Sequence, residues 1–420
     1  MSTGTADIAA AVAGQAEWMT QLLIELVQAP TELHHEEPGQ TLMAGAFAAC
    51  GLAPRDIWLD AAALREHPNA SPFSWEVAGK RNVVATWPGR GSGGRSLILN
   101  GHIDVVPPAA AELWSSPPYL ARREGDWLYG RGAGDMKSGL VAIVGAVRAL
   151  REAGVALNAD VHLQSVVEEE CTGNGALQCL IHGMHADACV LTEPHPDHLT
   201  IAQVGVLWFH VEVAGEPVHA AYATTGHNAI EAAHVVLASL RELEAELNTD
   251  PPTPYDAIEH PINLNPGMIS GGDWTSTVAA SATLSCRLAM YPGTDPGHLQ
   301  RLVQAAVARA AQRDPFLAAH PPRVRYDGFV CEGSTVAVDE PLVQVLGGAY
   351  ERVHGKPPGL RPTTATTDAR HFVRSGIPAV CFGPRAERIH GIDERVSIAS
   401  MLDCAEVLAH FICDWAGVAT

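Results

Sequence analysis

The first half of the chain alternates short apolar runs with segments of helical periodicity. Residues 8–30 place apolar side chains at helical spacing and predict an opening amphipathic helix. Residues 140–154 predict a buried helix that ends at Gly154. Around them lie four apolar runs of strand length, NVVATW, SLILNGHID, DVHLQSVV and ACVL. Buried strands that alternate with helices predict an α/β layer structure whose chemistry lies in the loops at the strand ends.

The pattern changes after these strands. The run VGVLWFHVEVAG alternates apolar and polar residues like a half-buried antiparallel strand, and residues 228–248 predict a long amphipathic helix. Two further strands, a second helix and a last strand in VRYDGFV complete a smaller α+β unit. Helix and buried-strand patterns then return. The predicted bounds are 1–204 and 327–420 for an interrupted α/β domain and 205–326 for the inserted domain.

Composition and charge exclude several classes of protein. The chain is 47% hydrophobic and 18% charged, which indicates an ordered globular protein. Its 27 Lys and Arg against 47 Asp and Glu give a formal charge of −20, and no basic stripe indicates a nucleic-acid partner. No apolar run reaches the ~18–20 residues of a membrane span. Nine scattered cysteines without a CxxC pair, and no Lys/Arg-rich leader, predict free thiols and a cytoplasmic protein.

Acidic residues and histidines follow the ends of the apolar runs. His102 and Asp104 are two apart on a predicted strand and therefore project to the same side. A carboxylate beside an imidazole fixes its tautomer and raises its basicity as a metal ligand. The other candidates are Asp135 in a Gly-rich loop, the triplet Glu168, Glu169 and Glu170, Glu193 in LTEP, and His390 in a loop before the last helix.

These residue types together indicate a catalytic metal site. Histidine and carboxylate ligands with room for water suit zinc, and also cobalt or manganese. Two such ions ~3.5–4 Å apart that share a carboxylate and a water would lower the pKa of that water towards neutrality. A phosphate-binding loop around Asp135 is the competing interpretation. It is disfavoured because the segment lacks the GxxxxGK[ST] spacing and Lys137 follows the acid rather than a glycine.

Eight motifs in a fixed order resemble one family of enzymes. They are NGHIDVVPP, GRGAGDMKSG, EEE, LTEP, GEPVHAA, TTDARHF, IPAVCFGP and IHGIDERV. The set resembles the dinuclear-zinc amidohydrolases and peptidases of metallopeptidase family 20, which include acetylornithine deacetylase, succinyl-diaminopimelate desuccinylase, aminoacylase and carboxypeptidase G. The resemblance implies a mixed-sheet α/β zinc-peptidase catalytic domain. It also implies a ferredoxin-like α+β lid and dimerisation domain at residues 205–326, through which a homodimer forms.

The resemblance implies a role for each candidate residue. His102 looks like a ligand of one metal, and Asp104 looks like the carboxylate that orients it. Asp135 looks like the bridging ligand, in a family where the peptide bond after this aspartate is typically cis. Glu193 and His390 look like terminal ligands.

The acidic triplet leaves two registers open. The family triplet is Asp-Glu-Glu, whose middle residue is the general base and whose last residue binds metal. Laid over this chain, it makes Glu169 the base and Glu170 a ligand, with Glu168 in place of the aspartate. We prefer this register because the family triplet directly follows an apolar strand, as Glu168 follows Val167. The alternative register makes Glu168 the base and Glu169 the ligand.

The predicted lid carries its own marker, GEPVHAA. In the family, the histidine of this motif reaches the active site of the partner subunit and helps to stabilise the oxyanion, and His219 matches it. Many relatives have a substrate-contacting asparagine after the GG turn that follows. Ser276 and Thr277 stand near that place here. Arg287 matches a common family arginine.

These matches predict a hydrolase with two divalent ions, zinc first and cobalt or manganese as alternatives. We expect an N-acyl amino acid as substrate, because the fourth ligand is Glu193, as in the family's deacetylases and aminoacylases, whereas several carboxypeptidase relatives have Asp there. A metallo-carboxypeptidase or dipeptidase with the same site is the alternative. A metal-free relative is disfavoured because all five ligand positions are occupied. His195 and His198 are expected to be loop residues near the cleft.

Overall fold

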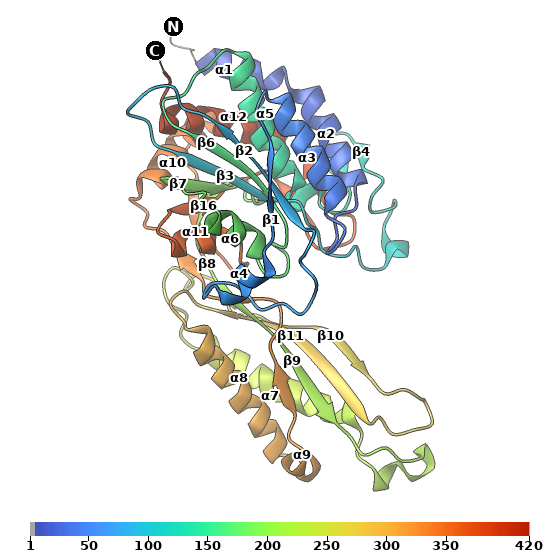
Figure 1. Cartoon of the computed structure of the whole chain (residues 1–420). Helices are drawn as coiled ribbons and strands as arrows, with labels where there is room; N and C mark the ends of the chain where they lie inside the picture. Colours follow the sequence, from blue (N-terminus) through green and yellow to red (C-terminus); the bar gives the residue numbers. More distant parts are fainter. Residues whose placement is uncertain (1–4, 420) are drawn as a thin grey trace.

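The apolar runs form the strands of a nine-stranded mixed sheet in the larger part of the molecule (Figure 1). The structure is a computed structural model, and it describes residues 5–419. The strands lie in the order β1-β2-β6-β3-β7-β16-β8-β14, with β15 paired to β8. Their bounds are β1 Arg55–Trp58, β2 Arg81–Trp87, β3 Leu97–His102, β6 Val161–Val166, β7 Ala188–Leu191, β8 His198–Gln203, β14 Ser334–Thr335, β15 Gly359–Thr363 and β16 Ala379–Cys381.

Four neighbouring strands at the centre of this sheet run parallel. β3 pairs in parallel with β6 and with β7, and β7 pairs in parallel with β16. Every residue of β3 and β7 is buried, which is typical of strands that are covered by helices on both faces. Parallel strands end at the same edge of a sheet, so the segments that follow β3, β6 and β7 are brought together there.

Helices cover both faces of this sheet. Leu97 and Leu99 belong to one core, whereas Ile98 belongs to the core on the opposite face, as the alternation of side chains along a strand requires. The helices of the first core are α1 Thr5–Ala13, α2 Ala16–Gln28, α3 Glu37–Ala49, α5 Ser138–Glu152, α10 Pro341–His354 and α12 Ile398–Ala416. Those of the second are α6 Asn174–Ile181 and α11 Ala369–Arg374, and the short α4 Ala61–Glu66 follows β1.

Two predicted helices differ in their bounds from the structure. The segment 8–30 forms two helices rather than one, and α1 and α2 meet at Gly14 and Gln15. Glycine is a poor helix former. The side chain of Gln15 donates a 2.7 Å hydrogen bond to the carboxylate of Glu152. The predicted helix 140–154 is α5. Gly154 follows its end with a φ of 76°, a conformation that glycine adopts without steric cost.

The inserted segment forms a second sheet that two long helices cover on one face (Figure 1). The strand order β10-β11-β9-β12 is antiparallel throughout. The chain order β9-α7-β10-β11-α8-β12 is the ferredoxin-like arrangement that the resemblance implied. β13 also pairs with β9. The bounds are β9 Gly205–Ala214, η3 Ala220–Thr225, α7 Ala229–Leu247, β10 Leu264–Gly271, β11 Ser281–Met290, α8 Pro296–Gln312, α9 Pro315–Ala319, β12 Arg323–Arg325 and β13 Val330–Cys331.

A small four-stranded sheet ties the end of the chain to the segment that precedes Asp135. Its order is β17-β18-β5-β4, and the register pairs Arg395 with Tyr129 and Ser397 with Trp127. This pairing holds the loop between β17 and β18 beside the turn η2. The bounds are η1 Ala111–Leu113, β4 Arg122–Glu124, β5 Trp127–Tyr129, η2 Ala133–Lys137, β17 Ala386–Glu387 and β18 Arg395–Ser397.

Two expectations from composition can be compared with the described residues. All nine cysteines are free, and eight of them are buried. None of the described helices is both long enough and apolar enough to cross a membrane.

Candidate metal centre and substrate cavity

Three strand ends deliver the acids and the first histidine to one edge of the large sheet. His102 is the last residue of β3, Glu169 and Glu170 lie in the loop after β6, and Glu193 lies two residues after β7. Because β3, β6 and β7 are parallel neighbours, their carboxyl ends bring residues together that lie up to about 90 positions apart in the chain. The prediction that the chemistry lies at strand ends agrees with this arrangement.

Asp135 lies between two histidines. Its Oδ1 is 3.1 Å from Nε2 of His102, and its Oδ2 is 3.3 Å from Nε2 of His390. The same nitrogen of His390 is 3.1 Å from Oε1 of Glu170, and the charge of Glu170 is the main cause that raises the pKa of His390 to about 11. Ligand atoms of His102, Asp135 and Glu170 all lie within 4.8 Å of one another. One carboxylate that faces two imidazoles with its two oxygens has the geometry of a bridging ligand.

Asp104 supports this group through two different contacts. Nδ1 of His102 donates to the main-chain oxygen of Asp104 at 2.9 Å, whereas the nearest carboxylate oxygen of Asp104 is 3.7 Å away. The Asp104 carboxylate instead accepts the backbone N–H groups of Glu169 at 3.3 Å and of Glu170 at 3.0 Å. Asp104 therefore fixes the ring of His102 mainly with its backbone, and its side chain holds the acidic triplet in place.

Glu193 carries a buried oxygen that is without a hydrogen-bond partner among the described residues. The residue is 5% exposed, and Oε1 is the atom concerned. Burial raises the pKa of this carboxyl to about 8, and the charges of Asp135 and Glu170 add to the effect. A buried carboxylate without a partner is unfavourable, and a divalent cation would satisfy it. The donor set of two imidazoles and three carboxylates therefore fits zinc or a similar ion.

Glu168 points away from these groups into a network of its own. Its side chain is fully buried. Its Oε1 accepts a hydrogen bond from Nε1 of Trp75 at 2.9 Å and forms an ion pair with Nζ of Lys80 at 3.0 Å. Oε2 accepts from the hydroxyl of Thr172 at 2.8 Å. A backbone φ of 66° at Glu168 ends the strand geometry, so strict alternation stops here. Lys80 neutralises one of the three neighbouring acids, which lowers their mutual repulsion.

Glu169 lies on the cavity side of the triplet. Its Oε2 is 3.8 Å from Nε2 of His102, and the residue lines the main cavity. Burial raises the pKa of Glu169 well above its ordinary range, and the charges of Glu193 and Asp368 act in the same direction. A carboxylate with a raised pKa beside ligand groups is suited to accept and return a proton.

Two buried residues in and around the Asp135 turn, Glu394 and Lys137, were not among the predicted site residues. The carboxylate of Glu394 accepts the backbone N–H groups of Gly132, Gly134 and Asp135 at 3.1, 2.9 and 3.0 Å. Nζ of Lys137 donates to the carbonyl oxygens of Leu26 at 2.8 Å and Ala29 at 3.0 Å. The peptide bond after Asp135 is cis, as the resemblance implied. The acid in IDERV was the available signal for Glu394, but its partners lie about 260 residues earlier in the chain.

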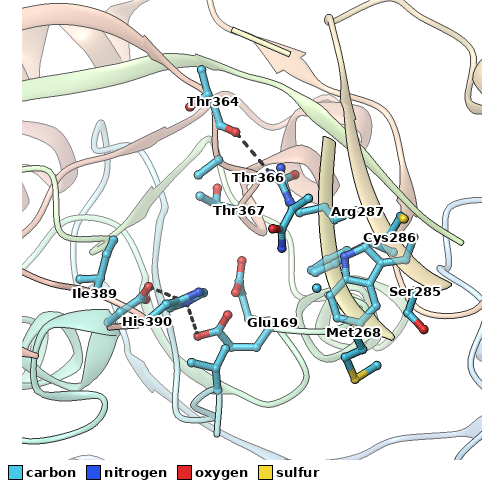
Figure 2. Close-up of a pocket in the computed structure, with 18 of the residues that line it drawn as sticks. Glu169, Met268, Ser285, Cys286, Arg287, Thr364, Thr366, Thr367, Ile389 and His390 are labelled. Atoms are coloured by element: carbon cyan, nitrogen blue, oxygen red, sulfur yellow. Dashed lines mark hydrogen bonds and ion pairs between the residues drawn. The ribbon is translucent and has the colours of Figure 1, made fainter. Parts of the chain in front are cut away.

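A cavity of about 840 Å³ separates the edge of the large sheet from the uncovered face of the second sheet. Figure 2 shows Glu169 and His390 on one side of it and Arg287, Ser285 and Met268 on the other. Arg287 donates to the carbonyl oxygen of Thr364 at 3.3 Å. The aromatic and polar residues that line the cavity on the side of the second sheet include Trp208, His210, Asn265, Ser285, Arg287, Asp327 and Phe329.

His195 and His219 differ in their position relative to the cavity. His195, which we expected to be a loop residue near the cleft, lines the cavity and is stabilised by a 3.0 Å hydrogen bond with Thr200. Burial lowers the pKa of His195 to about 4, so its ring is neutral near pH 7. His219 lies outside the cavity. It is exposed, and its Nδ1 accepts the backbone N–H of Ala221 at 3.1 Å.

Ser276 and Thr277 lie next to His219 and not in the cavity. The carbonyl oxygen of Ser276 accepts the backbone N–H of Ala220 at 2.9 Å, and Thr277 forms a β-bridge with His219. The structure thus brings together His102, Asp104, Asp135, Glu169, Glu170, Glu193 and His390, and places His219, Ser276 and Thr277 elsewhere.

Several known proteins are similar to this chain in sequence or in fold. A deformylase of N-formyl-4-amino-5-aminomethyl-2-methylpyrimidine from Bacillus subtilis is 29% identical over 363 residues, which cover 81% of this chain and 84% of that protein. Human carnosine dipeptidase 1 has the same fold, with a TM-score of 0.79, 15% identity and coverage of 98% of this chain and 100% of that chain. A dinuclear metal binding peptidase from Bacillus subtilis superposes with a TM-score of 0.59 and 14% identity over 95% of this chain and 98% of that chain.

The family model of these enzymes covers most of the chain. It matches residues 98–414, a segment that contains His102, Asp135, the acidic triplet, Glu193 and His390. The chain therefore belongs to peptidase family M20/M25/M40 and is a hydrolase.

Proposed function

We propose that this hydrolase cleaves the amide bond of a small N-acylated amine, of which an N-acyl amino acid is the preferred form. The observation that carries the proposal is the position of Glu169. Its carboxylate lies 3.8 Å from His102 and faces an 840 Å³ cavity beside Asp135, Glu170 and His390. This cavity has room for a substrate of amino-acid or dipeptide size.

The proposed ligands are distributed around Asp135. His102 and His390 approach its two oxygens, and Glu170 and Glu193 complete the set. Two divalent ions, zinc in the first place and cobalt or manganese as alternatives, would polarise the amide carbonyl and lower the pKa of an attacking water. The orphaned oxygen of Glu193 supports the presence of a cation.

In the proposed reaction Glu169 moves the protons. Glu169 accepts the proton of the attacking water and delivers a proton to the leaving nitrogen, because the amine is a poor leaving group until it is protonated. The contacts of Glu168 with Trp75, Lys80 and Thr172 support the register in which Glu169 is the base. These three groups engage the Glu168 side chain, and the described residues that line the cavity do not include it, so it is poorly placed to contact an attacking water.

Two observations support a deacylase with an anionic substrate. The Bacillus subtilis relative is a deformylase, which removes a small acyl group from an amine. Arg287 faces the cavity, and Thr364 is the hydrogen-bond partner of its guanidinium. Burial lowers the pKa of Arg287, so an anionic partner would stabilise the charged form. The α-carboxylate of an N-acyl amino acid has the shape that a guanidinium binds with two hydrogen bonds.

We further infer a homodimer formed through residues 205–326, with His219 placed in the partner's active site. The exposure of His219 and the apolar side chains of Met268, Ile269 and Trp274, which are 66%, 56% and 73% exposed, support this inference. β10, which carries Met268 and Ile269, is an edge strand with unpaired backbone groups. The free cysteines support a cytoplasmic location.

The experiment that tests the function combines metal analysis with a substrate panel. The purified full chain, loaded with zinc or cobalt, is assayed against N-formyl and N-acetyl amino acids, the same acyl groups on amines that lack a carboxylate, and dipeptides. We expect about two ions per chain and the highest kcat/KM on N-acyl amino acids. Preference for dipeptides supports the carboxypeptidase or dipeptidase alternative. A metal-loaded protein that cleaves no amide contradicts the proposal.

A further inference from the structure

Three aromatic rings line the cavity on the side that faces the second sheet. They belong to Trp75, which precedes β2, to Trp208 on β9, and to Phe329, which directly precedes β13. The rings of Trp208 and Phe329 have centroids 5.3 Å apart and are nearly perpendicular, at 85°. Edge-to-face pairs are a favoured arrangement of aromatic rings, and the guanidinium of Arg370 lies over the ring of Phe329, 5.1 Å from its centroid.

These rings are held in place before any ligand binds. Nε1 of Trp75 donates to Glu168 at 2.9 Å, and the backbone N–H of Trp208 donates to the carbonyl oxygen of Phe329 at 2.7 Å. A Cβ on Gly328, whose φ is 82°, would lie 2.4 Å from Cε3 of Trp208, so the chain passes directly against one side of the indole. Rings that are already ordered lose little conformational freedom when a ligand binds.

The segment before Trp75 joins the two sides of the cavity. The backbone N–H of Gly328 donates to the carbonyl oxygen of Pro72 at 2.9 Å, and the hydroxyl of Ser74 donates to the carboxylate of Asp327. Trp75 therefore lies on a loop that is bound to the segment carrying Phe329. The three rings belong to one connected wall rather than to unrelated parts of the surface.

The charges around these rings favour a neutral ring over a cation. Aromatic groups also bind ammonium and guanidinium groups. However, Arg287 is the cross-strand neighbour of Trp208, its guanidinium donates to the carbonyl oxygen of Thr364, and a second guanidinium, that of Arg370, already lies over the Phe329 ring. Two carboxylates near this wall already have partners: Glu168 accepts from Nε1 of Trp75 and pairs with Lys80, and Asp327 is engaged by Ser74 and lies 3.1 Å from Nη1 of Arg325. A substrate cation here would meet the charge of Arg287 without a free anion.

We propose that Trp75, Trp208 and Phe329 form a subsite for a planar aromatic group on the amine half of the substrate. The inference rests on the proposed amide hydrolysis and names the class of amine that is released. Because Arg287 and Trp208 are paired across β11 and β9, a carboxylate bound to Arg287 places the neighbouring side chain of an amino acid against the indole.

The test compares substrates that differ in the ring alone. The metal-loaded full chain is assayed with N-acetylphenylalanine, N-acetylcyclohexylalanine and N-acetyllysine. The cyclohexyl group has a similar size but no π-face, so we expect a kcat/KM about 5- to 10-fold higher for the phenyl compound. Trp208→Leu should bring this ratio close to one, and Trp208→Phe should retain most of it. Trp58→Leu, at an edge strand where Trp58 is 51% exposed, is the matched control.

Binding gives a second measurement that does not require turnover. Calorimetry with the metal-loaded Glu169→Gln variant measures the affinities for N-acetylphenylalanine and N-acetylcyclohexylalanine, and the same preference is expected. Equal affinities and equal kcat/KM values overturn the subsite while amide hydrolysis stands. A preference for N-acetyllysine also overturns it and indicates a cation site. If no amide is cleaved, the proposed function fails, and the calorimetric preference alone then supports or contradicts the aromatic subsite.

Discussion

The two sides of the cavity are built by different means. On the side of the large sheet, acids and histidines from loops separated in the chain crowd around Asp135, and buried groups such as Glu394 and Lys80 hold them. On the other side, consecutive strands of the second sheet present Trp208, Arg287 and Asn265 side by side in one cross-strand row. The first side is rich in like charge, and the second is nearly neutral.

In the proposed function, this difference separates catalysis from recognition. Grouped carboxylates tolerate one another only with cations or internal partners nearby, so a change on the first side affects metal content or turnover. The open face of a sheet tolerates many side chains, because each points away from its own backbone. Changes on the second side are therefore expected to alter which substrate is used while the metal centre stays intact.

The largest expected effect comes from removing the group at the centre of the acidic side. Asp135→Ala takes away the carboxylate that approaches both His102 and His390. We expect bound metal to fall below one ion per chain and amide hydrolysis to become undetectable, because both ions lose a ligand. Metal is measured by mass spectrometry after dialysis. Asp339→Ala, at an exposed acid before α10, should retain both ions and activity.

A second change separates proton transfer from metal binding on the same side. Glu169→Gln should lower kcat by about 10²- to 10⁴-fold, the usual contribution of a general base, with an unchanged metal content. Stopped-time assays on the best substrate provide the measurement. An active Glu169→Gln variant together with an inactive Glu168→Gln variant that still binds metal would show that the triplet register is shifted by one residue.

A dimer of two different variant chains tests whether His219 of one subunit acts in the active site of the other. His219→Ala alone should lower kcat by about 10²-fold, the typical effect of losing one oxyanion donor. Co-expression of the His219→Ala and Glu169→Gln chains should restore activity, because one site of the heterodimer then has both groups intact. If the co-expressed chains form a dimer, as judged by its mass in solution, but show no recovery of activity, His219 does not act across the interface.

The role of the second side in substrate recognition is tested by removing the positive charge of Arg287. Arg287→Leu should lower kcat/KM for N-acetyl amino acids by about 10- to 100-fold, because a charge-assisted pair with the carboxylate is lost. Amides without a carboxylate should be cleaved at the original rate, and metal content should not change. Arg301→Leu, on α8 with a side chain that is 68% exposed, is the control. An equal loss on both kinds of substrate contradicts the assignment.

The smallest effect is expected from a substitution of Glu168, whose buried contacts hold the acidic triplet in place. Glu168→Gln replaces one of the two acceptor oxygens by an amide nitrogen, so one of the hydrogen bonds from Trp75 and Thr172 is lost. It also weakens the pair with Lys80, which retains Glu36 at 2.8 Å. We expect the free energy of unfolding in urea to fall by about 1–3 kcal/mol and metal content to remain. Glu66→Gln, at an exposed end of α4, should change it by less than about 0.5 kcal/mol. A loss of metal without a loss of stability would place Glu168 among the ligands.

Part of the site could be read from local sequence because each motif ends an apolar run. His102 ends β3, and the triplet and Glu193 come two residues after the ends of β6 and β7. Parallel strands bring these ends to one edge of the sheet. The strand and helix periods also indicated the inserted βαββαβ unit. Local patterns define such elements well, apart from the break at Gly14, where a single residue decides between one helix and two.

The supporting contacts could not be read in this way, because they join residues that are distant in the chain. The pairs of Glu168 with Trp75 and of Glu394 with Asp135 span 93 and 259 positions. Neither contact produces a periodic pattern in the amino-acid sequence. The wall of Trp75, Trp208 and Phe329 depends in the same way on how three segments meet.

The position of His390 in the chain has a consequence for how the protein is made. Four of the proposed ligands precede Gly205, where β9 and the inserted unit begin, whereas His390 follows that whole unit. Chains fold domain by domain as they leave the ribosome, so the inserted unit is complete while the centre still lacks its fifth group. β18 pairs with β5 only after Ser397 has been added. With the proposed ligands, loading of both ions would be tied to the end of synthesis, and an incomplete chain would not carry a finished centre.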